Sequence, residues 1–426
     1  MIRLSILVSI FFLIACSPSF HVKKSIIKAE KDLNNHIGFY LKDYKSKKVL
    51  VDYRSDRYFT PASNTKIFTF YTSLCLLGDS ISSTKYFYKG DSLIFQGLGD
   101  PTFLYSNTHH SSKTFDFLAK HKGPIFFYSK NFDTEALGPG WAWDDYNSYY
   151  SVERSAFPVY GNIISISKQG NEFKFQPSRF SSDLVTSSNV HKEDEFLRDI
   201  DSNQLTYFSG KKQNTSWQIP FRTSADLTAD LLSDTLHRNV DEFCGVFPTN
   251  STLLKSVPAD SLYKTMMQES DNFIAEQLLL QCSAVLSDTL KPEIAIRHAS
   301  EKLLNDLPDK PVWVDGSGLS RYNLFTPRSI VKLWEKIYEK VPEQRLLTLL
   351  PTGGKSGTLK NSYKADKPYI FGKTGSLSNN HCLSGYLYTK KGRLLIFSYM
   401  NNNFVKPSRE VRDYMQSILK EVYEKY

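Results

Sequence analysis

Ser63 and Lys66 stand three residues apart directly before a strongly apolar run at 67–77, so the first turn of the helix predicted there carries both. Side chains at this spacing lie on one face of a helix, one turn apart. A serine hydroxyl becomes a nucleophile when a base takes its proton, and a lysine amine can be that base if burial or a second cation lowers its pKa. The helix N-terminus also favours negative charge on the oxygen. The pair could therefore perform nucleophilic catalysis.

The S-x-x-K spacing alone is weak evidence, because it recurs along the chain. We interpret the other pairs as surface or packing positions, among them Ser25 with Lys28, Ser165 with Lys168, and Ser329 with Lys332.

Two more polar segments interrupt apolar patterns. The segment S-D-N at 270–272 lies within a long helical pattern predicted at 261–286, where a polar face or a helix cap is the simplest explanation. The segment K-T-G-S at 373–376 follows apolar residues 369–371 and precedes another strand. We expect it on a strand edge, where Gly375 allows the backbone of a ligand to approach closely.

The three segments occur in the order S-x-x-K, S-D-N, K-T-G, the signature of penicillin-binding proteins and class A β-lactamases. The chain resembles the class C low-molecular-mass penicillin-binding proteins, the D-alanyl-D-alanine carboxypeptidase/endopeptidases that trim bacterial cell wall. The long gap between Ser63 and Ser270 is similar to this family, whose catalytic domain is interrupted by inserted domains. Further matching segments, which extend the resemblance over nearly the whole mature chain, lie at 97–101, 139–145, 315–321, 350–354 and 357–359.

The resemblance implies a role for each motif residue. Ser63 would be the acylated nucleophile and Lys66 its base. Ser270 would relay a proton to the leaving group, and Asn272 would hold the substrate amide. Lys373 would bind the terminal carboxylate of the peptide, beside Thr374 as a further substrate-binding residue, and would help to keep Lys66 neutral. Backbone N–H groups of Ser63 and Ser376 would form the oxyanion hole.

The family also reads the side chain of the stem peptide, with an acidic residue near the tryptophan motif, an arginine and residues that follow K-T-G. The matching positions are Asp144, Tyr149, Arg321, Leu377 and Ser378. Asp145 is adjacent to Asp144. For Trp141 and Trp143 a packing role is at least as well supported as ligand contact.

The elements that must position these residues are of mixed type. The predicted strands and helices are a hairpin of 37–41 and 49–53, a helix at 67–77, a hairpin of 162–167 and 171–176, helices at 224–236, 261–286 and 327–341, strands at 383–388 and 394–399, and a helix from 408. They predict an α+β fold. By resemblance it is a β-lactamase/transpeptidase-like catalytic domain, with an antiparallel sheet flanked by helices and a helical subdomain. We assign residues 16–81 and 223–426 to it, and 82–222 to an inserted β-rich region.

The N-terminal segment predicts export. Arg3 precedes an apolar run at 4–15 that is too short to span a bilayer as a helix, and Cys16 follows it directly. This arrangement is typical of a signal peptide, 1–15, and its exit resembles the bacterial lipobox, in which the cysteine is lipidated. We expect an exported, periplasmic protein that a lipid at Cys16 anchors to the outer membrane. We assign no disulfide among the four other cysteines, because their spacing is wide and irregular and Cys75 and Cys282 lie in apolar helical patterns, where a buried free thiol is expected. The absence of C-x-x-C argues against a zinc ribbon or a thioredoxin-like site.

Composition narrows the function further. The 426 residues carry 53 Lys plus Arg and 44 Asp plus Glu, a formal charge of +9 that is spread along the chain. The sequence has no concentrated basic stripe of the kind that would indicate nucleic-acid binding.

Motifs of other enzyme classes are missing. The chain lacks G-x-S-x-G and H-E-x-x-H, and Leu349 replaces the first glycine that a phosphate loop ending at 354–356 would need. His381, although close to K-T-G, has no evident acidic partner, so we expect it to be structural or exposed.

The sequence therefore predicts a serine-type D,D-peptidase that acts on peptidoglycan stem peptides, uses neither metal nor organic cofactor, and takes β-lactams as covalent inhibitors. Two alternatives remain. A non-hydrolytic receptor for muropeptides or β-lactams would be acylated without turnover. A β-lactamase or esterase on the same fold would hydrolyse β-lactams rapidly, although no residue is identified for the deacylating water it needs.

Overall fold

The computed structural model describes residues 18–108, 112–170 and 172–426. Cys16 and the predicted signal segment lie outside these residues. None of the helices in the described ranges is long and apolar enough to cross a membrane.

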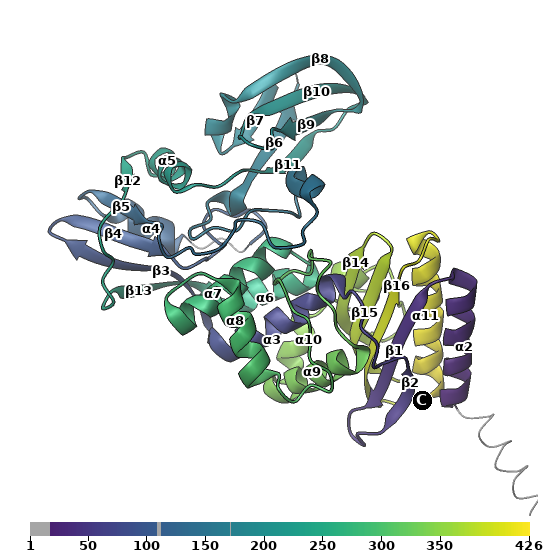
Figure 1. Cartoon of the computed structure of the whole chain (residues 1–426). Helices are drawn as coiled ribbons and strands as arrows, with labels where there is room; N and C mark the ends of the chain where they lie inside the picture. The colour runs from purple at the N-terminus through teal and green to yellow at the C-terminus, as the bar shows by residue number, and fades with distance from the viewer. Residues whose placement is uncertain (1–17, 109–111, 171) are drawn as a thin grey trace, which may run out of the picture.

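The lower part of the molecule in Figure 1 is built on an antiparallel sheet with the strand order β14-β15-β16-β1-β2. Its strands are β1 (His36–Asp43), β2 (Val49–Tyr53), β14 (Ile370–Leu377), β15 (Asn380–Tyr388) and β16 (Leu394–Asn402). The two central strands β15 and β16 are buried along almost their whole length. They are apolar on both faces because helices cover both faces of the sheet.

Alternate residues of β16 divide between two hydrophobic cores. Leu395 and Phe397 face helices α2 (Pro18–Leu33) and α11 (Ser408–Lys425), which lie side by side on one face. Ile396 and Met400 face the opposite core, which contains α3 (Lys66–Leu76) and α9 (Pro327–Lys340). This two-residue period gives the sheet two apolar sides, one against α2 and α11 and the other against α3 and α9.

A helical subdomain packs against α3 and completes the second core. Its helices are α6 (Ala259–Gln268), α7 (Asn272–Ser287), α8 (Pro292–His298) and α10 (Glu343–Leu349). The α+β prediction, with a flanked antiparallel sheet and a helical subdomain, is confirmed.

The single helix predicted at 261–286 is wrong, because the chain breaks it into α6 and α7. Ser270 adopts a left-handed conformation with φ 61°. The Asp271 side chain caps α7 by accepting a hydrogen bond from the Ile274 N–H at 2.9 Å. An aspartate cap satisfies a free N–H group at a helix start, so it favours a new helix at this point over continuation of the old one.

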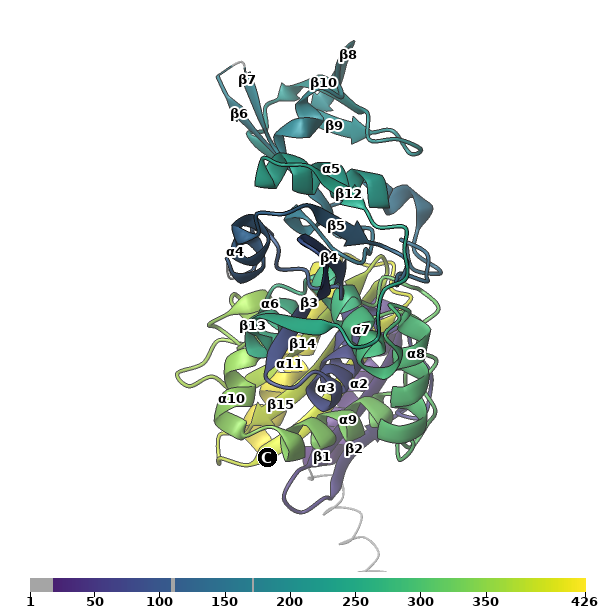
Figure 2. The ribbon, with the colours of Figure 1, turned by 90° about the vertical axis from the view of Figure 1, so that its left-hand side faces the viewer.

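The segment 80–258 forms the upper and left-hand parts of Figure 1; in Figure 2 its strands β3 (Ser80–Lys89) and β13 (Thr252–Pro258) lie beside α6 and α7, and its other strands lie above them. It contains three sheets, with the strand orders β12-β5-β4-β3-β13, β11-β6-β7 and β8-β10-β9. The predicted hairpin at 162–176 is confirmed as β6 (Ile163–Gln169) and β7 (Glu172–Gln176). The other elements are β4 (Ser92–Gly97), α4 (Lys113–Lys120), β5 (Ile125–Tyr128), β8 (Leu184–Glu193), β9 (Glu195–Arg198), β10 (Leu205–Lys212), β11 (Ser216–Pro220), α5 (Ala225–Leu236) and β12 (Val240–Glu242).

The first of these sheets extends past the predicted boundary at residue 222. Strands β12 and β13 follow that boundary, yet they pair with β5 and β3 respectively. The chain returns to the catalytic helices at α6. Short strands whose partners lie more than a hundred residues away give no local sequence signal, which is why the boundary cannot be read from periodicity.

Candidate active site

Ser63 lies in a single 3₁₀ turn, Ala62–Thr65, that leads directly into α3. Two glycines let neighbouring chain segments approach this turn. A Cβ on Gly318, whose φ is +87°, would stand 2.0 Å from the Ala62 carbonyl oxygen, and a Cβ on Gly375 would stand 2.5 Å from the Pro61 carbonyl oxygen. Gly375 therefore makes room for the turn that carries Ser63, where the sequence predicted the approach of a ligand.

The Lys66 amine lies at the centre of the site and is completely buried. Its Nζ is 2.9 Å from Ser63 Oγ, 2.5 Å from Asn272 Oδ1 and 2.7 Å from the Ser317 carbonyl oxygen. A neutral amine has two N–H donors and one lone pair. With the donors directed at the Asn272 and Ser317 oxygens, the lone pair faces the Ser63 hydroxyl, which is the arrangement that a general base requires.

Burial lowers the pKa of Lys66 to about 8, against the opposing effect of the Asp315, Asp271 and Glu276 carboxylates. A charged ammonium loses its hydration in this environment, so the neutral form is favoured relative to a lysine in water. Near neutral pH, a fraction of the protein molecules therefore has Lys66 in its neutral form, which can accept a proton.

Ser270 and Lys373 form a second pair beside the first. The Lys373 amine is buried and donates to Ser270 Oγ at 2.8 Å and to the Thr374 carbonyl oxygen at 2.8 Å. Burial and the nearby charge of Lys66 place its pKa well below the usual lysine value. Ser270 occupies the break between α6 and α7, with a left-handed φ of 61°, and its side chain lines the cavity.

Asn272 is held in one orientation by its two neighbours. Its Oδ1 accepts from Lys66, and its Nδ2 donates to the Tyr150 carbonyl oxygen at 2.9 Å. The amide nitrogen has two hydrogens, so one remains available for a ligand carbonyl.

Buried carboxylates underneath fix the loop that contacts Lys66, and sequence reasoning missed them. Glu276 accepts from the Ser317 N–H at 2.7 Å and pairs with Arg154 at 3.4 Å. Asp315 accepts from the Gly318 N–H at 2.9 Å. Burial first, and the Asp315 charge second, raise the pKa of Glu276 to about 7 against the effect of Arg154. The available signal for Glu276 was a charged residue within a largely apolar helical pattern.

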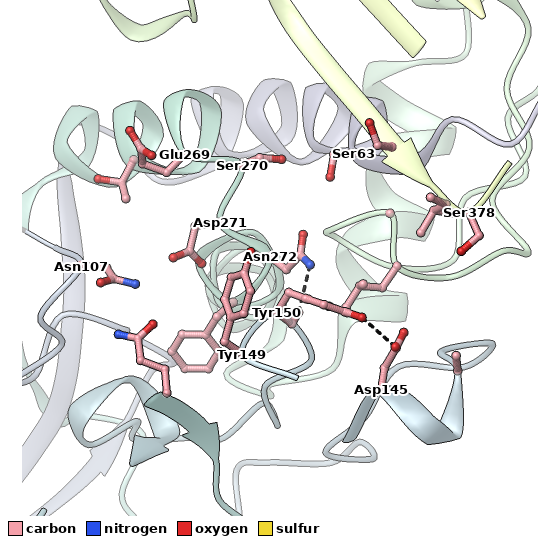
Figure 3. A pocket seen from close by; sticks show the side chains of 18 of the residues that line it. Ser63, Asn107, Asp145, Tyr149, Tyr150, Glu269, Ser270, Asp271, Asn272 and Ser378 are labelled. Atoms are coloured by element: carbon pink, nitrogen blue, oxygen red, sulfur yellow. Dashed lines mark hydrogen bonds between the residues drawn. The ribbon is translucent and has the colours of Figure 1, made fainter. Parts of the chain in front are cut away.

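A cavity of about 790 Å³ opens above these groups. Figure 3 shows Ser63 and Asn272 between Ser378 on one side and Asn107 on the other. The structure brings these predicted site residues together along the cavity: Ser63, Asp144, Tyr149, Ser270, Asn272, Arg321, Ser376, Leu377 and Ser378. Lys66 and Lys373 are buried beneath it, whereas Thr374 lines a smaller neighbouring cavity of about 220 Å³ with Ser376 and His381.

The two adjacent aspartates of the tryptophan motif have different environments. Asp145 accepts a hydrogen bond from the Tyr150 hydroxyl at 2.7 Å (Figure 3), while the structure gives Asp144 no partner within the described residues. The Trp141 Nε1 donates to Asp315 Oδ2 at 2.9 Å, which is a structural role, and Trp143 is 76% exposed. Asp144 is therefore the carboxylate free to meet a ligand.

His381 is buried, so of the two predicted roles the structural one applies. Its Nδ1 lies 2.7 Å from Ser376 Oγ, on the strand that follows K-T-G. Burial, with a smaller effect of Arg412, lowers its pKa to about 4. The imidazole is consequently neutral at physiological pH and holds the Ser376 hydroxyl without adding charge.

Sequence reasoning missed other cavity residues as well. Tyr105, Asn107, Tyr150 and Gln218 reach it from the inserted region, and Glu269 reaches it from the end of α6. No local motif marks them. The described part of the chain contains no cluster of three or more His, Cys, Asp or Glu side chains that could hold a metal ion.

Comparisons with known proteins match nearly the whole chain. A family model described as the D-Ala-D-Ala carboxypeptidase 3 (S13) family matches residues 22–422. D-alanyl-D-alanine carboxypeptidase DacB of Haemophilus influenzae is 23% identical over 446 aligned residues, which cover 94% of this chain and 92% of that protein.

Two solved structures show a similar fold. The crystal structure of penicillin binding protein 4 (dacB) from Haemophilus influenzae superposes with a TM-score of 0.75 at 19% identity, covering 92% of this chain and 99% of that one. The same protein complexed with a novel β-lactam gives a TM-score of 0.72 at 18% identity, covering 94% and 99% respectively. The β-lactamase/transpeptidase-like fold expected from the sequence is thereby confirmed.

Proposed function

Since this chain belongs to the D-Ala-D-Ala carboxypeptidase 3 (S13) family, we propose that its site hydrolyses peptidoglycan stem peptides or cross-links through an acyl-enzyme on Ser63. The observation that carries this proposal is the buried Lys66 amine, held by Asn272 and the Ser317 carbonyl with Ser63 Oγ at 2.9 Å. The other site residues have roles that follow from this pair.

In the first half of the reaction, Ser63 Oγ bonds to the carbonyl carbon of the D-Ala-D-X peptide and gives its proton to Lys66. Backbone N–H groups of Ser63 and Ser376 stabilise the resulting oxyanion. That proton then passes through the Ser270 hydroxyl to the leaving nitrogen, the C–N bond breaks, and Lys66 is neutral again. Lys373, 2.8 Å from Ser270 Oγ, orients the hydroxyl for this transfer.

In the second half, a water molecule attacks the ester carbon and Lys66 accepts its proton. The bond to Ser63 Oγ breaks, and the proton returns from Lys66 to that oxygen. The products are a stem peptide that ends in D-alanine and a free amine. Atoms and charge balance without any further reactant.

Substrate binding divides between the two ends of the cleft. Lys373 and Thr374 hold the terminal carboxylate of a carboxypeptidase substrate. At the other end, Asp144 and Arg321 have no ion-pair partner in the part of the chain that is described, and they line the cavity together with Tyr149, Leu377 and Ser378. One free carboxylate and one free guanidinium suit a stem-peptide residue whose side chain carries an amine and a carboxylate.

The experiment that tests the function follows products of the unaltered protein. We expect fluorescent penicillin to label it, mass spectrometry to locate the acyl group on the peptide that contains Ser63, and a muropeptide ending in D-Ala-D-Ala to release D-alanine. A cross-linked muropeptide dimer tests endopeptidase activity in the same assay. Labelling without turnover of either muropeptide would favour the receptor, and rapid β-lactam hydrolysis would favour the β-lactamase.

We also propose that the protein is exported to the periplasm and held at the outer membrane by a lipid on Cys16, on the strength of the apolar run and cysteine at 4–16. Cys16→Ser should move the protein from the membrane fraction to the periplasmic fraction with its penicillin labelling unchanged, as measured on immunoblots of fractionated cells. Ser19→Ala, three residues further along, is the matched control and should stay with the membrane. Equal membrane association of the Cys16 variant would refute the anchor.

A further inference from the structure

The three-stranded sheet β11-β6-β7 has one polar face and one apolar face. Opposed residues form two polar rows across it: Gln218, Ser165 and Gln176 in one, and Ser216, Ser167 and Lys174 in the other. The intervening residues, which include Ile164, Ile166, Phe175 and Ile219, belong to the core of the inserted region. The polar face therefore lies away from that core.

This polar face is hollowed and continues into the candidate active site. A cavity of about 660 Å³ lies over it, lined by both polar rows, Gln169 and Tyr149. Tyr149 and Gln218 also line the cavity that contains Ser63. Figure 3 shows Tyr149 near Asn272 in the cavity that contains Ser63. The two cavities share Tyr149 and Gln218, so a polymer attached to a peptide in the first cavity would lie next to the second.

The side chains of this polar face indicate which class of ligand it could bind. The two rows consist of amide and hydroxyl side chains and a single lysine. Within the described residues, no side chain of either row makes a hydrogen bond to another protein group. Tyr149, 64% exposed, presents an aromatic ring at its edge. Amides and hydroxyls supply the donors and acceptors that sugar hydroxyl and N-acetyl groups need, and a tyrosine ring offers an apolar body with a polar tip.

A second cavity beside Tyr149, of about 700 Å³, is a weaker candidate because Glu193, Asp194 and Glu195 line it. Each of these carboxylates is already paired with a basic side chain, Lys212, Lys168 and His191 respectively, so they are less available to a sugar than the unpaired side chains of the polar rows. The neutral face is the one whose chemistry matches a glycan.

We propose that the polar face of β11-β6-β7, here called the glycan groove, binds the glycan strand of peptidoglycan, the polymer of N-acetylated amino sugars to which the stem peptide is attached. The inference rests on the proposed function, because it requires the stem peptide in the Ser63 cavity. Three adjacent strands span about 10 Å, so side chains on all three can contact several hydroxyl and N-acetyl groups of a bound saccharide. The groove would make polymeric peptidoglycan a better substrate than a free peptide.

The test compares two substrates with the same pentapeptide, one free and one linked to a tetrasaccharide of peptidoglycan. In Lys174→Ala/Gln176→Ala we expect kcat/KM on the glycan-linked substrate to fall about tenfold, the loss of roughly two hydrogen bonds, through a higher KM. The value for the free pentapeptide should not change. Lys211→Ala/Gln213→Ala removes the same residue types from exposed positions outside the groove and is the matched control.

A second variant and a binding measurement separate the possible outcomes. Ser167→Trp should fill the groove and give the same selective loss. Peptide-free glycan strands should bind the unaltered protein in isothermal titration calorimetry and bind the groove variants weakly. Equal kinetics of variant and unaltered protein on both substrates, or no binding of glycan strands, would overturn the groove, whereas inactivity of the unaltered protein on both substrates would overturn the proposed function.

Discussion

Replacing Ser63 by alanine is expected to abolish labelling by fluorescent penicillin and to lower kcat for D-alanine release on the order of a millionfold, the effect of removing the nucleophile from a serine hydrolase. Within the described residues, Ser63 carries the one hydroxyl hydrogen-bonded to the Lys66 amine, at 2.9 Å, and the other two partners of that amine are carbonyl oxygens. The measurements are gel fluorescence after labelling and a coupled assay of D-alanine.

The control for this variant is Ser25→Ala, which removes a serine with the same S-x-x-K spacing. Ser25 lies on α2 and donates to Glu421 at 2.8 Å, on the side of the molecule covered by α11. It should retain full labelling and hydrolysis. Thermal unfolding of both variants should resemble that of the unaltered protein, since Ser63 is partly exposed at the cavity and packs in neither core. Residual labelling of Ser63→Ala would place the nucleophile elsewhere.

The site residues whose positions could be predicted from the sequence are those whose motifs lie next to a clear helix or strand pattern. Lys66 begins a helix with a clear apolar pattern, Ser63 lies in the 3₁₀ turn directly before it, and 373–376 lies on the strand β14 that its apolar flank predicts. In both segments the short-range pattern determines the element, and the element determines where the side chain points. The order of the three motifs then supplied the fold through resemblance.

The parts that could not be predicted depend on contacts between distant residues. The break at Ser270 requires the Asp271 cap to prevail over a helical pattern that continues on both sides. Glu276 is one of several polar residues in a largely apolar helix, and only the fold shows that it holds Ser317 against Lys66. Similarly, β13 joins its sheet by pairing with β3, far away in the sequence. Such contacts leave no period to read.

The proposed inserted region contacts residues of the candidate site directly. The Tyr150 carbonyl fixes the amide of Asn272, and Arg154 pairs with Glu276 beneath Lys66. The orientation of two residues at the candidate site therefore depends on contacts with Tyr150 and Arg154, from the segment that we propose to be inserted. We expect the inserted region to be required for activity as well as for recognition of the polymer.

The second large effect concerns Lys66 itself. Lys66→Ala should reduce kcat/KM for D-alanine release by about 10²- to 10⁴-fold, the contribution of a general base. Lys66→Arg should be no more active, because arginine keeps a positive charge and hydrogen-bond donors but cannot accept a proton at accessible pH. Both are measured as rates of penicillin acylation and muropeptide hydrolysis. An active Lys66→Arg variant would show that the charge, and not proton transfer, is what the reaction needs.

The pH profile distinguishes a base from a merely structural lysine. Protonated Lys66 cannot take the proton of Ser63, and its pKa is about 8, so kcat/KM of the unaltered protein should rise with pH and level off above that value. Glu276→Gln keeps an acceptor for the Ser317 N–H but removes a carboxylate that raises the Lys66 pKa. Its rising limb should therefore move to lower pH, provided that thermal unfolding shows the variant folded. A limb that stayed in place, or moved to higher pH, would mean that the titrating group is not Lys66.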